Sequence, residues 1–340
     1  MDEKRNTPDK RMKVVDLFCG CGGLSLGFQN AGFEILAAYD AWDTAIECYK
    51  ENFHHPASCL DLSAVDHAIA EIRQWNCDII IGGPPCQDFS HAGKRQEGAR
   101  ANLTTCFAKI VSAIKPAWFV MENVDRAITS ASYAQARNIF LNAGYGISEL
   151  VLDASFCGAP QKRKRLFCIG RLGEENEFIV ERIQKRMSKK PMTVREHLGS
   201  ELGIEHYYRH PRNYNRRAVF SIDEPSPTIR GVNRPIPMGY PGHAQDSAPI
   251  DSLIRPLTSL ERARIQTFPV DYKWVGSKTE QETMIGNAVP VKLAEFVGRS
   301  ILDENCNQGN ARRLSFSSSP ENHIVTFAKS ARCEQLSFRL

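Results

Sequence analysis

Apolar and polar residues follow two distinct patterns along the first half of the chain. Short apolar segments that end near Gly, Asp or Pro are typical of buried strands, and they cover 13–18, 33–39, 77–81, 117–121, 145–152 and 165–169. Segments with helical spacing of apolar residues lie at 24–30, 42–52, 64–75, 103–114 and 125–142. Strands separated by helix-length segments predict an α/β fold, with a mostly parallel, doubly wound sheet covered by helices on both faces.

The regular pattern stops near residue 173 and returns at two helical segments, 258–267 and 290–302. Between them, 181–217 is rich in Lys and Arg with interleaved Tyr, and 225–256 is dense in Pro and Gly. We expect an N-terminal extension, a main domain, a smaller irregular domain, a segment that packs back on the main domain, and a poorly ordered Ser- and Asn-rich tail. The boundaries are 1–12, 13–174, 175–255, 256–302 and 303–340.

Composition and charge narrow the function classes. The chain has 340 residues, of which 42% are hydrophobic and 24% charged, so it carries enough apolar material for a core and is not a disordered protein. Its net charge of +4 is too small for a histone-like protein. We find no apolar run near the ~20 residues of a membrane span and no signal peptide, so we expect a cytoplasmic protein without a membrane partner. The 11 cysteines lack paired C-x₂-C spacing, so we expect thiols and no metal site.

A glycine-rich turn follows the first expected strand. In DLFCGCGGLSLGF (16–28), the glycines expose backbone N–H groups at a helix N-terminus, where a ligand can approach. The turn is not the dinucleotide fingerprint, because Ser25 occupies the third glycine position, and no Gly-Lys-Ser/Thr of a P-loop follows. Asp40 and Asp61 follow later strands, where carboxylates suit a ribose and an adenine amino group. This set favours S-adenosylmethionine, an adenosyl ligand without a pyrophosphate; the alternative is an ordinary glycine-rich turn with two surface acids.

Two candidate catalytic residues also follow strands. The strand 77–81 runs into GGPPCQDFS, where two glycines and two prolines form a stiff turn that presents Cys86, a candidate nucleophile. Glu122 ends the apolar strand in AWFVMENV, where burial raises a carboxyl pKa enough to hold a proton near neutral pH. The alternatives are an incidental loop thiol and an acid that caps the following helix.

Polar residues of later segments complete the candidate site. Arg163 and Arg165 lie two residues apart before a strand, so on an extended segment they share one face. Paired guanidinium groups suit a phosphate or a base oxygen, and the alternative is a solvated basic stretch. Asn287 lies in a turn before the last expected helix.

These motifs together resemble one family. DLFCGCGG, the acid Asp40, GGPPCQDFS, MENV, QKRKR and GNAVP occur in this order along the chain. The set resembles the DNA (cytosine-5) methyltransferase family, in particular its single-chain bacterial modification enzymes. The resemblance covers 13 to about 302, with a variable stretch over 175–255, where the family has its target-recognition domain. It implies the fold of S-adenosylmethionine-dependent methyltransferases.

The resemblance also implies roles for individual residues. Cys86 adds to C6 of cytosine, Glu122 protonates the ring N3, and Arg165 supports the base oxygen with Arg163 beside it. The implied S-adenosylmethionine-binding residues are Phe18, Gly20, Gly22, Gly23, Asp40, Asp61, Leu62, Asn287 and Val289. In the variable stretch we expect 230–240 to read bases, since Arg and Asn make bidentate base contacts. The expected DNA-binding residues are Ser90, Arg100, Thr228, Arg230, Asn233 and Arg234.

The chain departs from the family pattern at two places. The ribose acid of the family is usually Glu followed by an aromatic residue, whereas Asp40 is followed by Ala41, so we expect adenine stacking by that neighbour to be lost. An acid often precedes the arginine that matches Arg100, and here the preceding residue is Ala99. Neither departure removes a group that methyl transfer requires.

The predicted function is therefore sequence-specific DNA (cytosine-5) methylation. We expect the base to be flipped out of duplex DNA, because its reacting face is not reachable inside the helix. The expected partners are double-stranded DNA and, functionally, a cognate restriction endonuclease. We expect a monomeric bacterial protein of the cytoplasm that associates with the nucleoid through DNA. The alternatives are a tRNA cytosine-5 methyltransferase and a catalytically silent DNA-binding relative.

Overall fold

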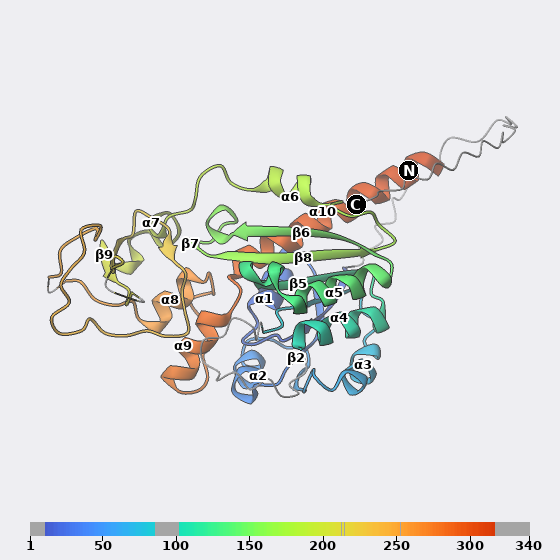
Figure 1. The fold of residues 1–340 in the computed structure, drawn as a ribbon, viewed down its shortest axis with the longest axis horizontal. Coiled ribbons are helices and arrows are strands. Elements are labelled where there is room, and N and C mark those ends of the chain that lie inside the picture. Colours follow the sequence, from blue (N-terminus) through green and yellow to red (C-terminus); the bar gives the residue numbers. More distant parts are fainter. Residues whose placement is uncertain (1–10, 86–101, 212, 214, 252, 317–340) are drawn as a thin grey trace, which may run out of the picture.

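The computed structural model describes residues 11–316, except for 86–101, 212, 214 and 252 (Figure 1). A seven-stranded sheet forms its centre, in the order β3-β2-β1-β4-β5-β8-β6. The first five strands of the chain run parallel, and β8 runs antiparallel to both of its neighbours. The strands are β1 (Lys13–Leu17), β2 (Glu34–Asp40), β3 (Ala57–Cys59), β4 (Ile79–Gly82), β5 (Trp118–Val124), β6 (Tyr145–Asp153) and β8 (Lys164–Leu172). The predicted α/β class and mostly parallel sheet are confirmed.

Helices cover both faces of this sheet because successive side chains of each strand point to opposite sides. Val14 and Ile79 pack on the face covered by α1 (Gly23–Ala31), α6 (Val180–Arg186) and α10 (Val291–Phe316). Val15 and Ile80 pack on the other face, which is covered by the three helices at the lower right of Figure 1. These helices are α3 (Val65–Arg73), α4 (Leu103–Ile114) and α5 (Ala131–Asn142), with a short 3₁₀ turn η2 (Asp125–Thr129) before α5.

Two boundaries differ from those expected. The main core extends past residue 174, because Ile179 and Ile183 beside and within α6 pack against the sheet. The last helix continues past residue 302 to Phe316, into the segment expected as a poorly ordered tail. No proline interrupts the sequence between Pro290 and Pro320, so nothing in the backbone ends the helix earlier.

A smaller lobe (residues 193–257) lies beside the carboxyl ends of the strands, on the left of Figure 1. Its elements are short, as expected from its Pro- and Gly-rich sequence: α7 (Val194–Leu198), η4 (Gly199–Leu202), β9 (His206–Tyr208), β10 (Val219–Ser221) and β11 (Ser226–Pro227). β11 pairs in parallel with β7 (Gln161–Lys162), so the lobe is joined to the main domain by backbone hydrogen bonds.

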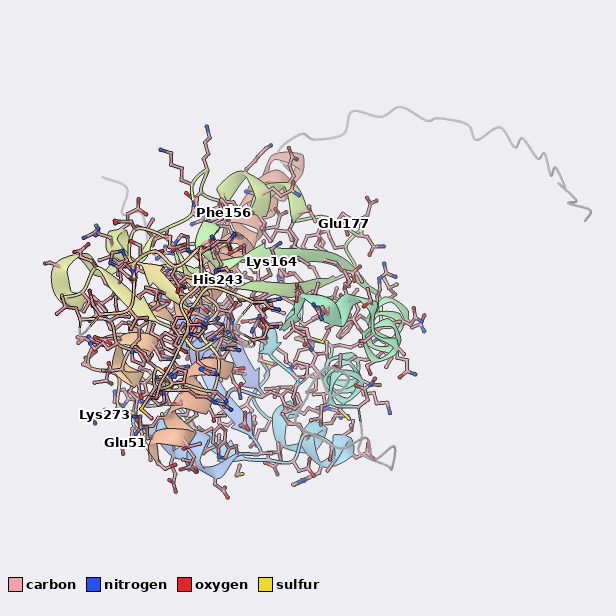
Figure 2. All side chains as sticks on the ribbon, turned by 60° about the vertical axis from the view of Figure 1, so that its left-hand side comes forward. Glu51, Phe156, Lys164, Glu177, His243 and Lys273 are labelled. Atoms are coloured by element: carbon pink, nitrogen blue, oxygen red, sulfur yellow. The ribbon has the colours of Figure 1, made fainter. Side chains whose placement is uncertain are left out.

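Three further helices line the boundary between the lobes: α2 (Asp43–Lys50), α8 (Ser259–Ile265) and α9 (Lys278–Asn287). Tyr207 and Phe220 of the smaller lobe share one apolar cluster with Ile285 of α9. At the outer edge, Lys273 Nζ lies 3.3 Å from Glu51 Oε2, and Figure 2 shows the two side chains together. Among the described helices, none is long and apolar enough to span a membrane.

Helices α1 and α10 approach so closely that Gly27 has no room for a side chain. A Cβ atom there would lie 2.4 Å from Ala294 Cβ and 2.6 Å from the carbonyl oxygen of Val291. We expect Gly27→Ala to lower the free energy of unfolding by about 1–3 kcal/mol, although Ala is the better helix former. Urea denaturation measures this change, with exposed Gln29→Ala in the same helix as the control. A Gly27→Ala protein as stable as the wild type would show that α10 can move away from α1.

Candidate active site

The glycine turn folds sharply between β1 and α1 because three of its residues adopt positive φ angles: 60° at Phe18, 52° at Gly20 and 92° at Gly22. Such angles favour glycine. A Cβ atom at Gly23 would lie 2.4 Å from the carbonyl oxygen of Val289, so the turn touches the segment that follows α9. The close approach at Gly23 therefore brings the start of α1 against a part of the chain distant in sequence.

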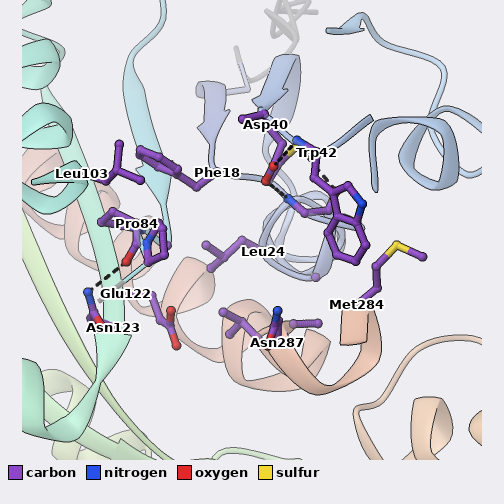
Figure 3. A pocket seen from close by; sticks show the side chains of 18 of the residues that line it. Phe18, Leu24, Asp40, Trp42, Pro84, Leu103, Glu122, Asn123, Met284 and Asn287 are labelled. Carbon is purple, nitrogen blue, oxygen red and sulfur yellow. Dashed lines mark hydrogen bonds between the residues drawn. The ribbon is translucent and has the colours of Figure 1, made fainter. Parts of the chain in front are cut away.

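Asp40 connects this turn to the end of β2. One carboxylate oxygen accepts a hydrogen bond from the N–H of Gly20 at 2.8 Å, and the other accepts from the N–H of Trp42 at 2.9 Å (Figure 3). Burial raises the pKa of Asp40, and these backbone N–H groups oppose that rise. The carboxylate is thus fixed at the carboxyl end of the sheet, where ligands of such folds bind.

A cavity of about 610 Å³ opens at this edge of the sheet. Most of the predicted S-adenosylmethionine-binding residues line it, namely Phe18, Gly20, Gly23, Asp40, Asp61, Leu62, Asn287 and Val289. Gly22 is not among the lining residues; a Cβ atom there would meet the ring of Phe53 at 2.4 Å. Gly22 therefore allows the turn to pack on Phe53, just after α2, and on Tyr49 within α2, while its neighbours face the cavity.

Trp42 is a lining residue that the sequence reasoning missed. It lies between Asp40 and Met284 in Figure 3. The expectation that an aromatic neighbour is absent considered only Ala41, the residue directly after the acid. The available signal was the aromatic residue one position further along, at the start of α2.

Glu122 and Arg165 form an ion pair at the other end of the same cavity, with 2.9 Å between Glu122 Oε1 and Arg165 Nε. Arg165 is paired with Val124 across the antiparallel strands β5 and β8, so Glu122, two residues earlier, lies diagonally opposite on the same face. Burial raises the pKa of Glu122, and the positive charges of Arg165 and Arg163 oppose the rise. Desolvation is the largest of these effects, so the pKa of Glu122 lies above its ordinary value.

The turn after β4 lies directly against this pair. A Cβ atom at Gly83 would lie 3.1 Å from Glu122 Oε2. Asn123 Nδ2 donates to the carbonyl oxygen of Pro84 at 3.0 Å and so holds the Pro-Pro turn beside β5 (Figure 3). Pro85 lines the cavity. Cys86, Ser90 and Arg100 lie outside the described residues, so their predicted roles stay predictions.

Arg163 also lines the cavity, but its hydrogen bonds go to the backbone. It is 1% exposed and donates to the carbonyl oxygens of Ile229 at 3.0 Å, Gly286 at 3.1 Å and Asn287 at 3.3 Å. Burial and the neighbouring Arg165 lower the pKa of Arg163, whereas the Glu122 carboxylate raises it. The two arginines expected to act together therefore differ, since Arg165 faces Glu122 and Arg163 faces three carbonyl groups.

The predicted DNA-binding residues of the smaller lobe make several contacts within the protein. Thr228 Oγ1 donates to the Lys162 carbonyl oxygen at 2.7 Å, and Arg230 Nη2 donates to that of His210 at 2.5 Å. Asn233 Nδ2 donates to the carbonyl oxygen of Leu257 at 2.8 Å, which occupies part of the amide group expected to read bases. Arg234 is exposed.

A buried hydrogen-bond chain lies beneath the glycine turn. Ser25 Oγ donates to Asp16 Oδ2 at 2.6 Å, and Tyr49 OH donates to Ser25 Oγ at 2.6 Å. Burial raises the pKa of Asp16 to about 7, the Ser25 hydroxyl opposes the rise, and the Asp40 charge adds to it. The motif that opens the glycine turn thus begins with an acid whose pKa is raised to about 7.

This raised pKa makes stability depend on pH. Between about pH 4 and pH 7 the folded chain keeps the Asp16 proton that the unfolded chain releases, so stability falls as pH rises through this window. Asp16→Asn is neutral throughout and keeps an acceptor for Ser25. We expect the stability of Asp16→Asn to fall less steeply with pH than that of the wild type. The difference between the two slopes is up to about 1.4 kcal/mol per pH unit in that window. Urea denaturation from pH 4 to pH 8 measures both proteins; parallel curves would contradict the assignment.

Comparisons with known proteins agree with this geometry. The family model "C-5 cytosine-specific DNA methylase" matches residues 12–303. The chain is 55% identical over 305 residues to the type II methyltransferase M.HgiDI of Herpetosiphon aurantiacus, an alignment that covers 89% of this chain and 98% of that protein. It is 54% identical over 294 residues to the type II methyltransferase M.HindV of Haemophilus influenzae, covering 86% and 97% of the two chains.

A solved structure shares the fold. The S. pombe Dnmt2 methyltransferase superposes with a TM-score of 0.65 at 19% identity, covering 88% of this chain and 100% of that one. With the family match over almost the whole described region, the chain belongs to the C-5 cytosine-specific DNA methylase family.

Proposed function

We propose that this protein transfers a methyl group from S-adenosylmethionine to C5 of a cytosine flipped out of a specific short duplex DNA sequence. The observation that carries the proposal is a single cavity with two chemically different ends. One end holds the glycine turn and Asp40, and the other holds the Glu122–Arg165 pair. A cofactor bound at the first end and a base bound at the second would meet inside one cavity.

The first end fits S-adenosylmethionine. A Cβ atom built at Gly20 would meet nothing within 4 Å, so the cavity side of the turn is open for a ligand. The Asp40 carboxylate suits ribose hydroxyls, and the Trp42 ring suits an adenine face. S-adenosylmethionine, when bound, supplies an electrophilic methyl group on its sulfonium.

The second end fits a cytosine ring. In this proposal the Glu122 carboxyl group, whose pKa is raised by burial, donates its proton to the ring N3, and Arg165 donates to the adjacent base oxygen. Both interactions draw electron density from the ring and make C6 a better electrophile. Gly83 leaves space beside Glu122, and Asn123 holds the turn that leads to Cys86.

We assign the role of nucleophile to Cys86, which directly follows the cavity-lining Pro85 in the sequence. The thiolate forms a bond to C6, and the electron pair of the C5–C6 double bond moves to C5 as N3 takes the Glu122 proton. C5 then forms a bond to the methyl carbon, whose bond to sulfur breaks. Loss of the C5 proton to a base restores the C5–C6 double bond as the C6–sulfur bond breaks and expels the thiolate. N3 returns its proton to the Glu122 carboxylate, which leaves 5-methylcytosine and the enzyme in its starting state.

The smaller lobe is the proposed target-recognition domain. Arg234 is exposed on it, so its basic side chain can reach phosphates and base edges. We further propose a monomer that acts on bacterial DNA in the cytoplasm at the nucleoid, beside a restriction endonuclease as its functional partner. The names of both curated relatives as type II methyltransferases favour duplex DNA over the tRNA alternative and over a silent relative.

Cytosine methylation in cells tests the mechanism directly. Bisulfite sequencing of DNA from cells that express the wild type should show protected cytosines in one sequence context. We expect Cys86→Ala to abolish protection, because no adduct forms, and Glu122→Gln to slow methyl transfer by roughly 10²–10⁴-fold. Cys306→Ala, an exposed thiol of α10, is the control and should protect DNA normally.

Equal protection by wild type and Cys86→Ala would defeat the covalent mechanism. Labelled methyl transfer into tRNA and not into duplex DNA would support the tRNA alternative. Absence of transfer into either nucleic acid would support a silent relative.

Cofactor affinity tests the proposed role of Trp42. Stacking of a base on an aromatic ring contributes about 1–3 kcal/mol, so we expect Trp42→Ala to weaken binding of S-adenosylhomocysteine by roughly 5- to 150-fold. Trp42→Phe keeps an aromatic face and should retain most of the affinity. Isothermal titration calorimetry measures all three proteins, and unchanged affinity in Trp42→Ala would place the adenine elsewhere.

A further inference from the structure

We propose that Arg163 is a positioning residue that couples target recognition to the cofactor cavity, acting with Gln161 and Gln266. This inference rests on the proposed function and deepens it. It concerns a buried polar junction between the smaller lobe and the segment 285–288, which continues into the cavity wall. The three side chains are 1%, 0% and 0% exposed, so the junction is fully inside the protein.

Ile229 is the part of the smaller lobe held by this junction. Its backbone N–H donates to Gln161 Oε1 at 2.9 Å, and its carbonyl oxygen accepts from Arg163 Nη1 at 3.0 Å. Both polar groups of one peptide position are therefore held by side chains of the main domain. Ile229 directly precedes 230–240, the segment expected to read bases.

The same side chains hold the cavity wall with their other polar atoms. Arg163 Nη2 donates to the carbonyl oxygens of Gly286 at 3.1 Å and Asn287 at 3.3 Å. Gln161 Nε2 donates to Gln266 Oε1 at 2.8 Å, and Gln266 Nε2 donates to the carbonyl oxygens of Ala288 at 3.1 Å and of Ile285. Two separate chains of hydrogen bonds thus link Ile229 to the end of α9 and to Ala288 directly after it.

Direct backbone contact reinforces this link. A Cβ atom at Gly286 would lie 2.0 Å from the backbone nitrogen of Gly231 and 2.2 Å from the carbonyl carbon of Arg230. Without a gap between the two segments, a displacement of 230–231 displaces the end of α9. Gly286, Asn287 and Ala288 all line the cavity, so the displacement reaches the cofactor end.

The composition of the junction also argues for a specific role. A buried guanidinium group is costly, and the hydrogen bonds of Arg163 go to three neutral carbonyl groups. An apolar side chain would fill the space at lower cost but would not fix the relative position of three backbone segments. Binding of DNA to 230–240 and binding of the cofactor beside Asn287 therefore favour the same arrangement of the junction, and linkage makes the effect reciprocal.

Binding of S-adenosylhomocysteine with and without DNA measures the coupling. The dissociation constant is determined by calorimetry for the free protein and for the protein saturated with duplex DNA that contains the methylated site. For the wild type we expect DNA to tighten binding by roughly 5- to 150-fold. Arg163→Lys cannot span three carbonyl groups, and Gln266→Met removes the donor to Ala288; we expect both variants to reduce the ratio to below about threefold.

Arg264→Lys is the matched control. Arg264 lies in α8 and contacts Glu201 of the smaller lobe at 2.8 Å, so it also crosses the boundary between the lobes, but it contacts neither Ile229 nor 285–288. We expect this variant to keep the wild-type ratio. Thermal unfolding of each variant separates loss of coupling from loss of the fold, and Gln266→Met keeps the test open if Arg163→Lys does not fold.

Three results would overturn the inference. The first is a wild type that methylates DNA but binds S-adenosylhomocysteine equally well with and without DNA. This result would leave the proposed function intact. The second is that DNA tightens S-adenosylhomocysteine binding in folded Arg163→Lys and Gln266→Met as much as in the wild type. Both residues would then have a structural role only. The third is a wild type that transfers no methyl group to DNA, in which case the proposed function fails and the coupling fails with it.

Discussion

The buried pair of Glu122 and Arg165 is the interaction on which the rest of the site depends. Removal of a carboxylate from water costs several kcal/mol, and an adjacent guanidinium group repays only part of that cost. The pKa of Glu122 is raised although Arg165 Nε lies 2.9 Å away, so desolvation exceeds attraction. The pair thereby combines a carboxyl group of raised pKa with a cation that lies directly against it. A more exposed pair would lack the desolvation that raises this pKa.

The antiparallel direction of β8 is what makes this pair possible. The parallel strands β4 and β5 end at the cavity edge of the sheet, so residues at their carboxyl ends, such as Glu122, reach the cavity. β8 runs the opposite way, and therefore its beginning lies at that edge, which places Arg165 there. In a parallel β8 the same arginine would lie at the far edge of the sheet. One reversed strand thus provides basic residues to an edge that otherwise receives only strand ends.

Features set by local chain geometry could be predicted from the sequence, and features set by distant contacts could not. The glycine turn, Asp40 and Glu122 follow strands whose apolar patterns are clear, so their shared edge follows from the parallel topology. Trp42 was missed because an aromatic residue was expected only directly after the acid, whereas both Ala41 and Trp42 line the cavity. The backbone partners of Arg163 are 66, 123 and 124 residues away in sequence, and no periodicity marks such contacts. The helix α9 was also missed, because its apolar residues do not form a single stripe.

Two kinds of contact join the smaller lobe to the main domain, and they differ in how strictly they fix the position of the lobe. The apolar cluster of Tyr207, Phe220 and Ile285 provides cohesion, but apolar contacts tolerate small sliding movements at little cost. The hydrogen bonds at Ile229 are directional, and each buried group left without its partner costs about 1–3 kcal/mol. Because the same side chains hold both Ile229 and the 285–288 turn, a movement that breaks one bond weakens the others. Such a junction favours discrete arrangements over continuous deformation, which is the property that communication between two binding sites requires.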